Sequence, residues 1–418
     1  MQTINIKQIN SVSIIEMEEP GKNTQLVLAL IPFIVLHGLM HILATTLPAL
    51  SPLVKAEFQL TNTEIGMLSF AFAAAIGFGS IVSGMLSDRY DGIRLINLGF
   101  FSTAILSALL LLSRDFLSLT LVFIVMGFGL SFYHPSALSR IANSFKNKRG
   151  RAFGVHETGA SIGIAVTPLI AAFICFYAEW RFVYLFWTFP TILFAFLLFK
   201  MMKEGEVGRM KRMFLSDART NANGNDVTLK DFLRQMISTG SIRRIYVIEG
   251  LFGFVFGGSL TFIPIFLNEA KGLSPELAVM LTCVFTAGGA IGKFVGGHFS
   301  DLVGERKVMA YGFIIVAPLF FVVPFLPLLW AILALALAGL IFPTVLPAII
   351  TTISKEVPPS RTGMAFGLLM FAGFGFGSTS RIILGLVSDS FGISSVFYPL
   401  VVAVLIGGVL NVYVAEGE

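Results

Sequence analysis

The sequence predicts an all-α membrane protein in which twelve transmembrane helices form two pseudo-symmetric six-helix bundles. Of its 418 residues, 56% are hydrophobic and only 13% are charged, which is far more apolar than soluble globular proteins are. Apolar runs of about 20 residues or more, the length that crosses a bilayer as a helix, recur along the whole chain. One long polar stretch, residues 204–240, separates these runs into two sets of six. Soluble, fibrous, disordered and nucleic-acid-binding classes are therefore excluded.

The apolar runs give the expected helices in chain order. The first set lies at residues 26–50, 64–87, 92–113, 116–140, 150–176 and 181–202. The second set lies at residues 241–268, 275–299, 306–328, 329–354, 361–387 and 392–414. We therefore expect an N-terminal cytoplasmic tail (1–25), a first bundle (26–203), a cytoplasmic central loop (204–240) and a second bundle (241–418). The alternating ten-residue segments of a membrane β-barrel are absent from the sequence.

Lysine and arginine are distributed unevenly between the two ends of these helices. Of the 29 such residues, 23 fall on the side that includes both tails and the central loop, four fall on the other side and two lie inside helices. Basic residues near helix ends are retained on the cytoplasmic side. We therefore expect a multi-pass protein of the cell (plasma) membrane with cytoplasmic N- and C-termini. The polar N-terminal segment lacks the pattern of a cleaved signal peptide.

The two halves resemble each other at a fixed shift of 213 residues. Four separated regions match at this shift, and they pair Leu60-Thr61 with Leu273-Ser274, Met67-Leu68 with Met280-Leu281, Gly84 and Asp88 with Gly297 and Asp301, and Gly150-x-Ala-Phe-Gly154 with Gly363-x-Ala-Phe-Gly367. One shift that serves four regions indicates an internal duplication. Two equivalent bundles that face each other can rock around a shared central site.

The duplicated loops also carry a recognisable motif. GMLSDRYDGIR, from Gly84, and GGHFSDLVGERK, from Gly296, resemble the Gly-x-x-x-Asp-Arg-x-Gly-Arg loop of major facilitator superfamily transporters. The first copy has one extra residue before Gly92, and the second has Leu302 where an arginine is expected. In that superfamily the loop joins helices two and three and again helices eight and nine. Together with the twelve helices and the long central loop, the resemblance covers essentially the whole chain and implies that fold.

A narrower resemblance lies in the fourth and fifth predicted helices. The segments FYHPSALSRIA (132–142) and RGRAFGVHETGASIGIAVTPLIA (149–171) are similar to the Phe-His-Pro helix and the Gly-rich fifth helix of fosmidomycin-resistance-type drug exporters. This resemblance covers about 40 residues. It implies secondary active transport, with drug efflux by an antiporter and the proton as coupling ion.

The loop motif has a physical rationale that does not depend on any family. A carboxylate at Asp88 or Asp301, just past a helix end, can face the positive N-terminus of a neighbouring helix and pair with a nearby arginine. Such a contact holds one side of a transporter shut, and ordinary helix capping is the alternative. The available arginines are Arg149, Arg151 and Arg361. The candidate gating residues are Gly84, Asp88, Arg89, Arg94, Gly297, Asp301 and Arg306.

Ionisable residues at membrane depth are costly, and they are therefore candidates for binding substrate or protons. They are His37, His41, His134, Glu157, Glu249, Lys293 and Arg381. Carboxyl and imidazole groups at this depth can exchange protons near neutral pH, as proton coupling requires. The structural alternatives are hydrogen bonds between packed helices, including His134 to Glu157, ion pairs such as Lys293 with Glu249, and side chains that snorkel to the membrane interface.

Lys293 and Arg381 are the two cations inside predicted helices, and positive charge on both suits an anionic substrate. We expect no cofactor. His37 and His41 lie one helical turn apart, a spacing that can ligate zinc. No cysteine or carboxylate on the same helix completes such a set, so the sequence predicts no metal site.

Other function classes fit the sequence less well. HETGA at 156 lacks the second histidine of a metalloprotease helix, and GFGFG at 373 does not follow a strand as a nucleotide-binding glycine loop would, so we expect no enzyme. The sequence also contains no ATP-binding P-loop. The loops are too short for a receptor domain, and duplicated gates favour alternating access over an open channel. We therefore predict a monomeric secondary active transporter of a small-molecule substrate. Proton-coupled export of a small amphipathic or drug-like compound is the first hypothesis, and proton-linked uptake or exchange of a small organic anion is the second.

Overall fold

The protein is a bundle of membrane-spanning helices. A computed structural model describes residues 20–145, 149–203, 234, 239–357 and 362–413, and the secondary structure within these ranges is helical. Twelve helices in the described ranges are long and apolar enough to cross a membrane, which confirms the predicted fold class. Most of the predicted tail (1–25) and of the predicted central loop (204–240) lies outside the described residues.

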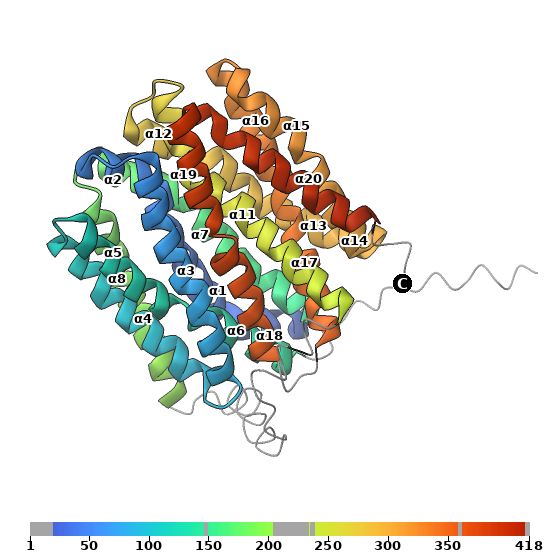
Figure 1. Cartoon of the computed structure of the whole chain (residues 1–418). Coiled ribbons are helices and arrows are strands. Elements are labelled where there is room, and N and C mark those ends of the chain that lie inside the picture. The colour runs from blue at the N-terminus through green and yellow to red at the C-terminus, as the bar shows by residue number, and fades with distance from the viewer. Residues whose placement is uncertain (1–19, 146–148, 204–233, 235–238, 358–361, 414–418) are drawn as a thin grey trace, which may run out of the picture.

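The helices follow the order of the predicted runs and lie side by side in one bundle (Figure 1). In the first half they are α1 (Pro20–Ala49), α2 (Ser51–Phe58), α3 (Asn62–Ser87), α4 (Gly92–Leu109), α5 (Phe116–Leu130), α6 (Tyr133–Ser144), α7 (Arg149–Cys175) and α8 (Arg181–Lys203). In the second half they are α11 (Gly240–Glu269), α12 (Pro275–Leu281), α13 (Cys283–Val303), α14 (Glu305–Ile314), α15 (Val316–Val322), α16 (Leu328–Ile341), α17 (Val345–Glu356), α18 (Thr362–Met370), α19 (Thr379–Phe391) and α20 (Phe397–Tyr413).

Local sequence explains where several of these helices begin and break. The Thr61 side chain accepts the Glu64 backbone N–H at the start of α3, and the Glu64 side chain accepts the Thr61 N–H in return. Ser274, the equivalent of Thr61 in the repeat, caps the start of α12 with its own side chain. The repeat is therefore visible in local structure. The eleventh span is interrupted by a π-helix at Phe371–Phe376, a feature that is frequent at functional sites.

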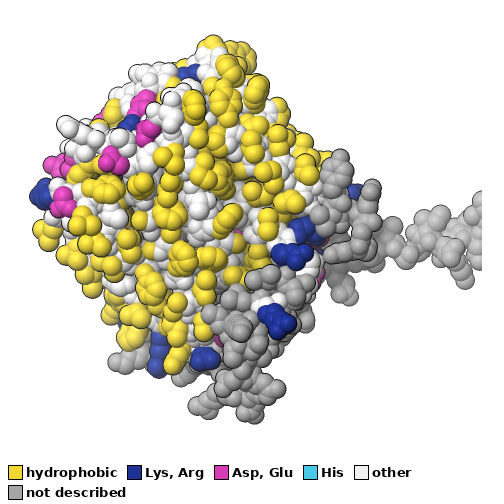
Figure 2. All heavy atoms as spheres, in the orientation of Figure 1, with side chains coloured by type: hydrophobic (Ala, Val, Ile, Leu, Met, Phe, Trp, Pro, Cys, Tyr) yellow, Lys and Arg dark blue, Asp and Glu magenta, His cyan; other side chains and the backbone are white. Residues whose placement is uncertain are grey.

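The outer surface of the bundle is apolar. Large side chains such as Phe173, Phe189 and Phe294 are exposed on it. Figure 2 shows hydrophobic side chains over the middle of the visible face, whereas charged side chains gather toward its ends. Soluble proteins rarely expose so continuous an apolar surface to water, whereas lipid hydrocarbon solvates it. The chain is therefore a multi-pass membrane protein.

The two halves contact each other along several pairs of helices. Helix α3 of the first half packs along α18, the π-helix and α19 of the second half. Helix α7 packs against α12 and α13, and α1 contacts α11. The repeat shift converts α3 into α12–α13 and α7 into α18–α19, so the first two contacts exchange with each other. An approximate two-fold axis between the bundles produces this exchange. Twelve crossings also return the chain to the face where it starts, and we call this end the terminal face and the other end the opposite face.

The backbones of the two halves touch directly along α3. A Cβ atom added at Gly77 would lie 2.2 Å from the backbone nitrogen of Gly375 in the π-helix, so no larger residue fits there. Nearer the terminal face, a Cβ atom on Gly84 would lie 2.8 Å from the carbonyl oxygen of Gly363. The α3 interface is therefore closed over most of its length.

Candidate functional site: a charged cavity between the two halves

A small cavity lies between the two halves. Its volume is about 90 Å³, enough for a few water molecules but well below the roughly 300–1,000 Å³ of typical small-molecule sites. Ionisable side chains from both halves line it, and they are His41, His134, Glu157, Glu249, Lys293 and Arg381. Six of the seven residues selected by membrane depth therefore share one cavity. The seventh, His37, packs against His41 and His134.

An ion pair joins the two halves at this cavity. Lys293 Nζ on α13 lies 3.2 Å from Glu157 Oε2 on α7, and both side chains are buried. The sequence had left open an ion pair of Lys293 with Glu249 and a hydrogen bond of His134 with Glu157. Neither occurs among the described residues, where both ring nitrogens of His134 lack a hydrogen-bond partner. The depth of these residues in the membrane does not determine which of them pair, because pairing depends on which faces of the helices pack against each other.

Two further side chains hold the histidines of the first half in place. The hydroxyl of Tyr133 on α6 donates to the carbonyl oxygen of Phe33 at 2.6 Å and lies 2.9 Å from His156 Nε2, whose N–H it can accept. The His37 ring stacks on the His156 ring with centroids 3.9 Å apart. His37 Nδ1 also lies 3.1 Å from the His156 carbonyl oxygen. His156 is not among the predicted site residues, and the structure places it in the packing that orients His37.

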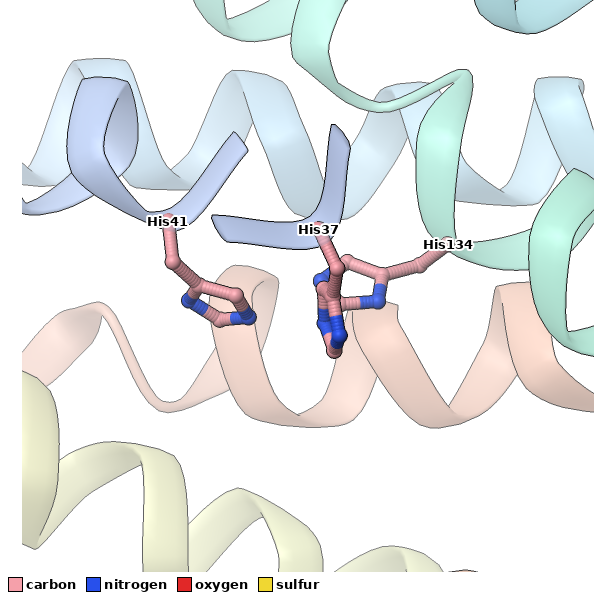
Figure 3. Close-up of side chains that lie close together, drawn as sticks. All are labelled: His37, His41 and His134. Carbon is pink, nitrogen blue, oxygen red and sulfur yellow. The ribbon is translucent and has the colours of Figure 1, made fainter. Parts of the chain in front are cut away.

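His37, His41 and His134 form a cluster beside the cavity. Figure 3 shows the first two rings projecting from α1 and the third reaching the same space from α6. The ring centroids are 4.8 Å apart for His37 and His41, 5.0 Å for His37 and His134, and 5.2 Å for His41 and His134. The one-turn spacing on α1 brings the first pair together, whereas only the fold adds the third ring.

Arg381 on α19 is a buried cation at the cavity wall, with only 6% of its surface exposed. Its guanidinium lies against Gly257 of α11, where an added Cβ atom would come within 2.6 Å of Nη2. It forms no ion pair with any residue in the described part of the chain, and its Nε has no hydrogen-bond partner there. Within the part of the chain that the structure describes, the cavity therefore holds one cation without an acidic partner.

Glu249 on α11 is a buried acid in the same wall. Its carboxyl group packs against Gly373 of the π-helix, where an added Cβ atom would lie 2.4 Å from Oε1. Oε2 has no hydrogen-bond partner, and Glu249 forms no ion pair with the other described residues. An unpaired carboxylate is costly at this depth unless it binds a proton or a cation.

At the terminal face, the first loop motif contacts the second half. The Asp88 carboxylate accepts the backbone N–H groups of Gly363 and Met364, each at 3.1 Å, at the start of α18. This is the predicted contact between an acid and the positive end of a neighbouring helix. The side chains of Arg149, Arg151 and Arg361, the predicted arginine partners, lie outside the described residues.

Comparison with known proteins decides the family. A family model described as Major Facilitator Superfamily matches residues 33–379 and 245–416. The chain belongs to this superfamily. Its members are membrane transporters that work by alternating access, and neither the family nor the fold indicates an enzyme.

Individual relatives agree with this assignment. The chain is 26% identical to the fosmidomycin resistance protein of Escherichia coli, with 91% of each chain covered. It is 25% identical to the glycerol-3-phosphate transporter of Bacillus subtilis, with 82% of each covered. A solved structure, a bacterial homologue of the human lysosomal transporter Spinster in an inward-facing conformation, matches with a TM-score of 0.71 at 18% identity. That match covers 94% of this chain and 97% of the other, and it supports the fold alone.

The second loop motif of this superfamily member is not engaged as the first is. Asp301 is exposed, and a Cβ atom on Gly297 would meet open space. Arg306 donates from Nε to the carbonyl oxygen of Asn411 at 2.8 Å, whereas Arg89 and Arg94 are exposed. At the terminal face, α3 is thus closed against α18, while the end of α13 makes no equivalent contact with the residues described there.

The structure adds a gating candidate that the sequence analysis missed. Asp389 of α19 accepts the backbone N–H groups of Asn62 (2.9 Å) and Thr63 (2.8 Å) at the start of α3, and it also accepts the Thr63 hydroxyl at 2.6 Å. A Cβ atom on Gly385 would lie 2.5 Å from the Asn62 carbonyl oxygen. Gly385-x-x-Ser-Asp389 repeats the Gly84-x-x-Ser-Asp88 pattern, and that third copy was the available signal.

Proposed function

We propose that the chain is a proton-coupled secondary transporter of a small organic anion and that Arg381 binds the anion. The observation that carries the proposal is the buried guanidinium at the cavity wall with no acidic partner among the described residues. A charge in such a place is expensive and is retained where it has a function. Guanidinium groups also match the geometry of carboxylates and phosphates.

The charge balance of the cavity supports the same proposal. Lys293 and Glu157 neutralise each other across 3.2 Å. With a proton on Glu249, the cavity carries one net positive charge from Arg381, which suits a singly charged anion. Release of the proton from Glu249 would cancel that charge and weaken anion binding. Glu249 is therefore our proposed coupling residue, and the Lys293–Glu157 pair links the two halves that must separate.

The cavity wall favours an anion with an apolar part. Phe252, Phe256 and Phe374 line it beside the charged groups. A cavity of about 90 Å³ is too small for most metabolites, so the halves must move apart before a substrate enters. One relative, the glycerol-3-phosphate transporter of Bacillus subtilis, is named for an anionic substrate, which agrees with this proposal.

We infer that two acids act as latches at the two faces. Asp88 caps the start of α18 at the terminal face, and Asp389 caps the start of α3 at the opposite face. Lys55 and Glu269 form a further ion pair between the halves at the opposite face. Because each latch bridges the halves at one end, release of one latch opens one face and leaves the other closed.

We further propose that the terminal face is cytoplasmic, that the membrane is the plasma membrane and that the transporter is a monomer. The excess of lysine and arginine on the predicted loops of the terminal face supports the orientation. We also propose that the two bundles comprise residues 26–203 and 241–418, as the sequence predicts.

Proton-coupled export of a small amphipathic or drug-like compound is a second candidate. The phenylalanine lining and the similarity to the fosmidomycin resistance protein favour it. The two candidates differ in their dependence on Arg381. An uncharged compound needs the apolar wall alone, whereas an anion loses its partner when the guanidinium is removed.

A thermal-shift screen of the purified protein tests the anion proposal. The compounds are small organic phosphates, phosphonates and carboxylates, each paired with an uncharged analogue. We expect only anions to raise the melting temperature, Arg381→Gln to abolish the shift and Arg381→Lys to retain part of it. Arg114→Gln, an exposed arginine outside the cavity, is the matched control. Equal shifts with uncharged analogues, or an undiminished shift in Arg381→Gln, would favour the second candidate.

Proton coupling is tested in proteoliposomes with an anion from that screen. We expect an imposed pH gradient to drive its accumulation in the wild type. Glu249→Gln should still exchange labelled for unlabelled anion but should no longer respond to the gradient. Gradient-driven accumulation by Glu249→Gln would remove Glu249 from the coupling mechanism.

A further inference from the structure

The His37, His41 and His134 cluster has a geometry that the transport proposal does not use. One ring nitrogen from each residue lies within 4.8 Å of the other two. The three side chains come from two helices, α1 and α6, and Figure 3 shows them converging on one space. His41 and His134 also line the central cavity, so an ion could reach them from there.

Each histidine of this cluster has at least one ring nitrogen that is not engaged by another residue in the described part of the chain. Both nitrogens of His134 are buried without a hydrogen-bond partner among the residues that the structure describes, and only 5% of this residue is exposed. His41 forms no side-chain hydrogen bond with the other described residues. His37 Nδ1 lies 3.1 Å from the His156 carbonyl oxygen, which can only accept, so Nδ1 carries the proton. His37 Nε2 therefore has its lone pair available, and no described residue forms a hydrogen bond with it.

We propose that His37, His41 and His134 bind a divalent transition-metal ion of the zinc class. Neutral imidazole is a preferred ligand of Zn²⁺, and a ligating histidine usually donates its other N–H to a carbonyl or carboxylate, as His37 does. A tetrahedral site places nitrogens about 3.3 Å apart, so the rings close by about 1.5 Å at most when the ion enters. The fourth position faces the cavity and is open to water.

Charges around the cluster permit a cation. Lys293 in the cavity wall acts electrostatically on His41, and Glu157 pairs with Lys293 at 3.2 Å. Glu157 Oε1 also lies 3.9 Å from His37 Nε2, so its negative charge faces the cluster. The ion would bridge α1 and α6 within the first half.

A second set of residues, His37, His156 and Glu157, is equally compact but less available. His156 Nε2 is bonded to the Tyr133 hydroxyl, and its ring is stacked on His37. Glu157 is already engaged by Lys293. Binding at this set would break two existing interactions, whereas binding at His37, His41 and His134 breaks none. The structure therefore assigns the ion to the three-histidine cluster.

Calorimetry and optical spectroscopy on the full chain test the proposal. The protein is purified without a polyhistidine tag, treated with EDTA and dialysed, and then titrated with ZnCl₂, with MgCl₂ as the comparison. We expect one Zn²⁺ per chain and no binding of Mg²⁺. With CoCl₂ in place of zinc, the visible absorption bands of a four-coordinate cobalt site should appear. His41→Ala and His134→Ala should each weaken zinc binding at least tenfold, whereas His298→Ala, at an exposed position on α13, should bind as the wild type does.

The metal-free melting temperature of each variant separates lost binding from lost folding. His41 is the less buried of the two, so His41→Ala keeps the test valid if His134→Ala unfolds. Absence of stoichiometric Zn²⁺ binding to the wild type would overturn the proposal. Binding that survives His41→Ala and His134→Ala but disappears in Glu157→Gln would also overturn it and would assign the ion to the second set.

Discussion

Lys293 and Glu157 are buried at the centre of the molecule, and each charge depends on the other. Their atoms are 3.2 Å apart, and less than a tenth of either side chain is exposed. Removal of one partner leaves an uncompensated charge in a medium of low dielectric constant, which is far more costly than removal of both. The effect of the pair on stability can therefore be separated from its effect on transport by comparing single and double substitutions.

We predict that Lys293→Ala lowers the free energy of unfolding by about 3 kcal/mol, because Glu157 loses its only described cation partner. The double variant Lys293→Met, Glu157→Gln should regain most of that loss without regaining transport. Thermal unfolding in detergent and flux in proteoliposomes measure the two effects. A double variant that is as unstable as Lys293→Ala would show that the pair does not stabilise the fold through its charges.

Residue types at the site were predictable from the sequence, whereas their partners were not. The cost of burying charge at membrane depth singled out Glu157, Lys293 and Arg381 without a structure. The Lys293–Glu157 pair depends on the rotation of α7 relative to α13, which hydropathy does not encode. The participation of His134 beside His37 and His41 depends in the same way on the approach of α6 to α1.

At the scale of helices, α3 and the eleventh span cap each other at both ends. Asp88, at the end of α3, caps α18, while Asp389, in the last turn of α19, caps α3. Burial raises the pKa of Asp88 from 3.8 to about 6, although the N–H groups of Gly363 and Met364 oppose this rise. When the interface opens and water reaches Asp88, its pKa returns toward the ordinary value, so the closed interface holds the proton more tightly.

We predict that acid closes the terminal face. The stabilisation from protonated Asp88 is complete below about pH 4 and is lost as the pH rises through about 6. Between pH 5 and pH 7.5 the closed-to-open ratio should fall by about tenfold. Electron-paramagnetic-resonance distances between labels at Tyr90 and Lys355, exposed on the two halves, measure this ratio.

Asp88→Asn is the control for that pH dependence. Thr362–Met370 of α18 contains no titratable side chain, and Arg140 of α6, which also packs on α18, is paired with Asp91 at 2.9 Å. The tenfold change should therefore disappear in Asp88→Asn while any contribution from the central cavity remains. An unchanged pH response in Asp88→Asn would exclude Asp88 as its origin.

We also predict that Gly77→Val disrupts the closed α3 interface. The added side chain would collide with the backbone of Gly375, only 2.2 Å from the position of a Cβ atom. Overpacking of this kind costs about 1–3 kcal/mol. Gly154→Val, at an open position on α7, is the matched control and should leave the melting temperature unchanged. Equal melting temperatures for the two variants would mean that α3 and the π-helix are not in contact.

Element order and number were predictable because hydropathy is a local property of the sequence. The interruption of the eleventh span by a π-helix was not, although the glycines of GFGFG lie within it. Asp389 was not predicted, because the repeat shift relates Asp88 to Asp301 and not to a residue at the end of α19. Its role becomes visible when the start of α3 and the end of α19 are seen to lie side by side.

At the scale of the whole molecule, the structure shows a conformation in which the central cavity is small and the two halves are in contact at both faces. Asp88 holds α3 to the second half at one end, and Asp389 holds it at the other. The account requires these contacts to open one at a time, since simultaneous opening would leave a continuous pore through the membrane.

Paired distance measurements on latch variants test this requirement most directly. One spin-label pair, Tyr90 and Lys355, reports on the terminal face, and a second pair, Gln59 and Ala270, reports on the opposite face, in a background without Cys175 and Cys283. The account predicts that Asp88→Ala lengthens only the first distance and Asp389→Ala lengthens only the second. Lengthening of both distances by either variant, or of neither distance by both variants, would contradict alternating access around the charged cavity.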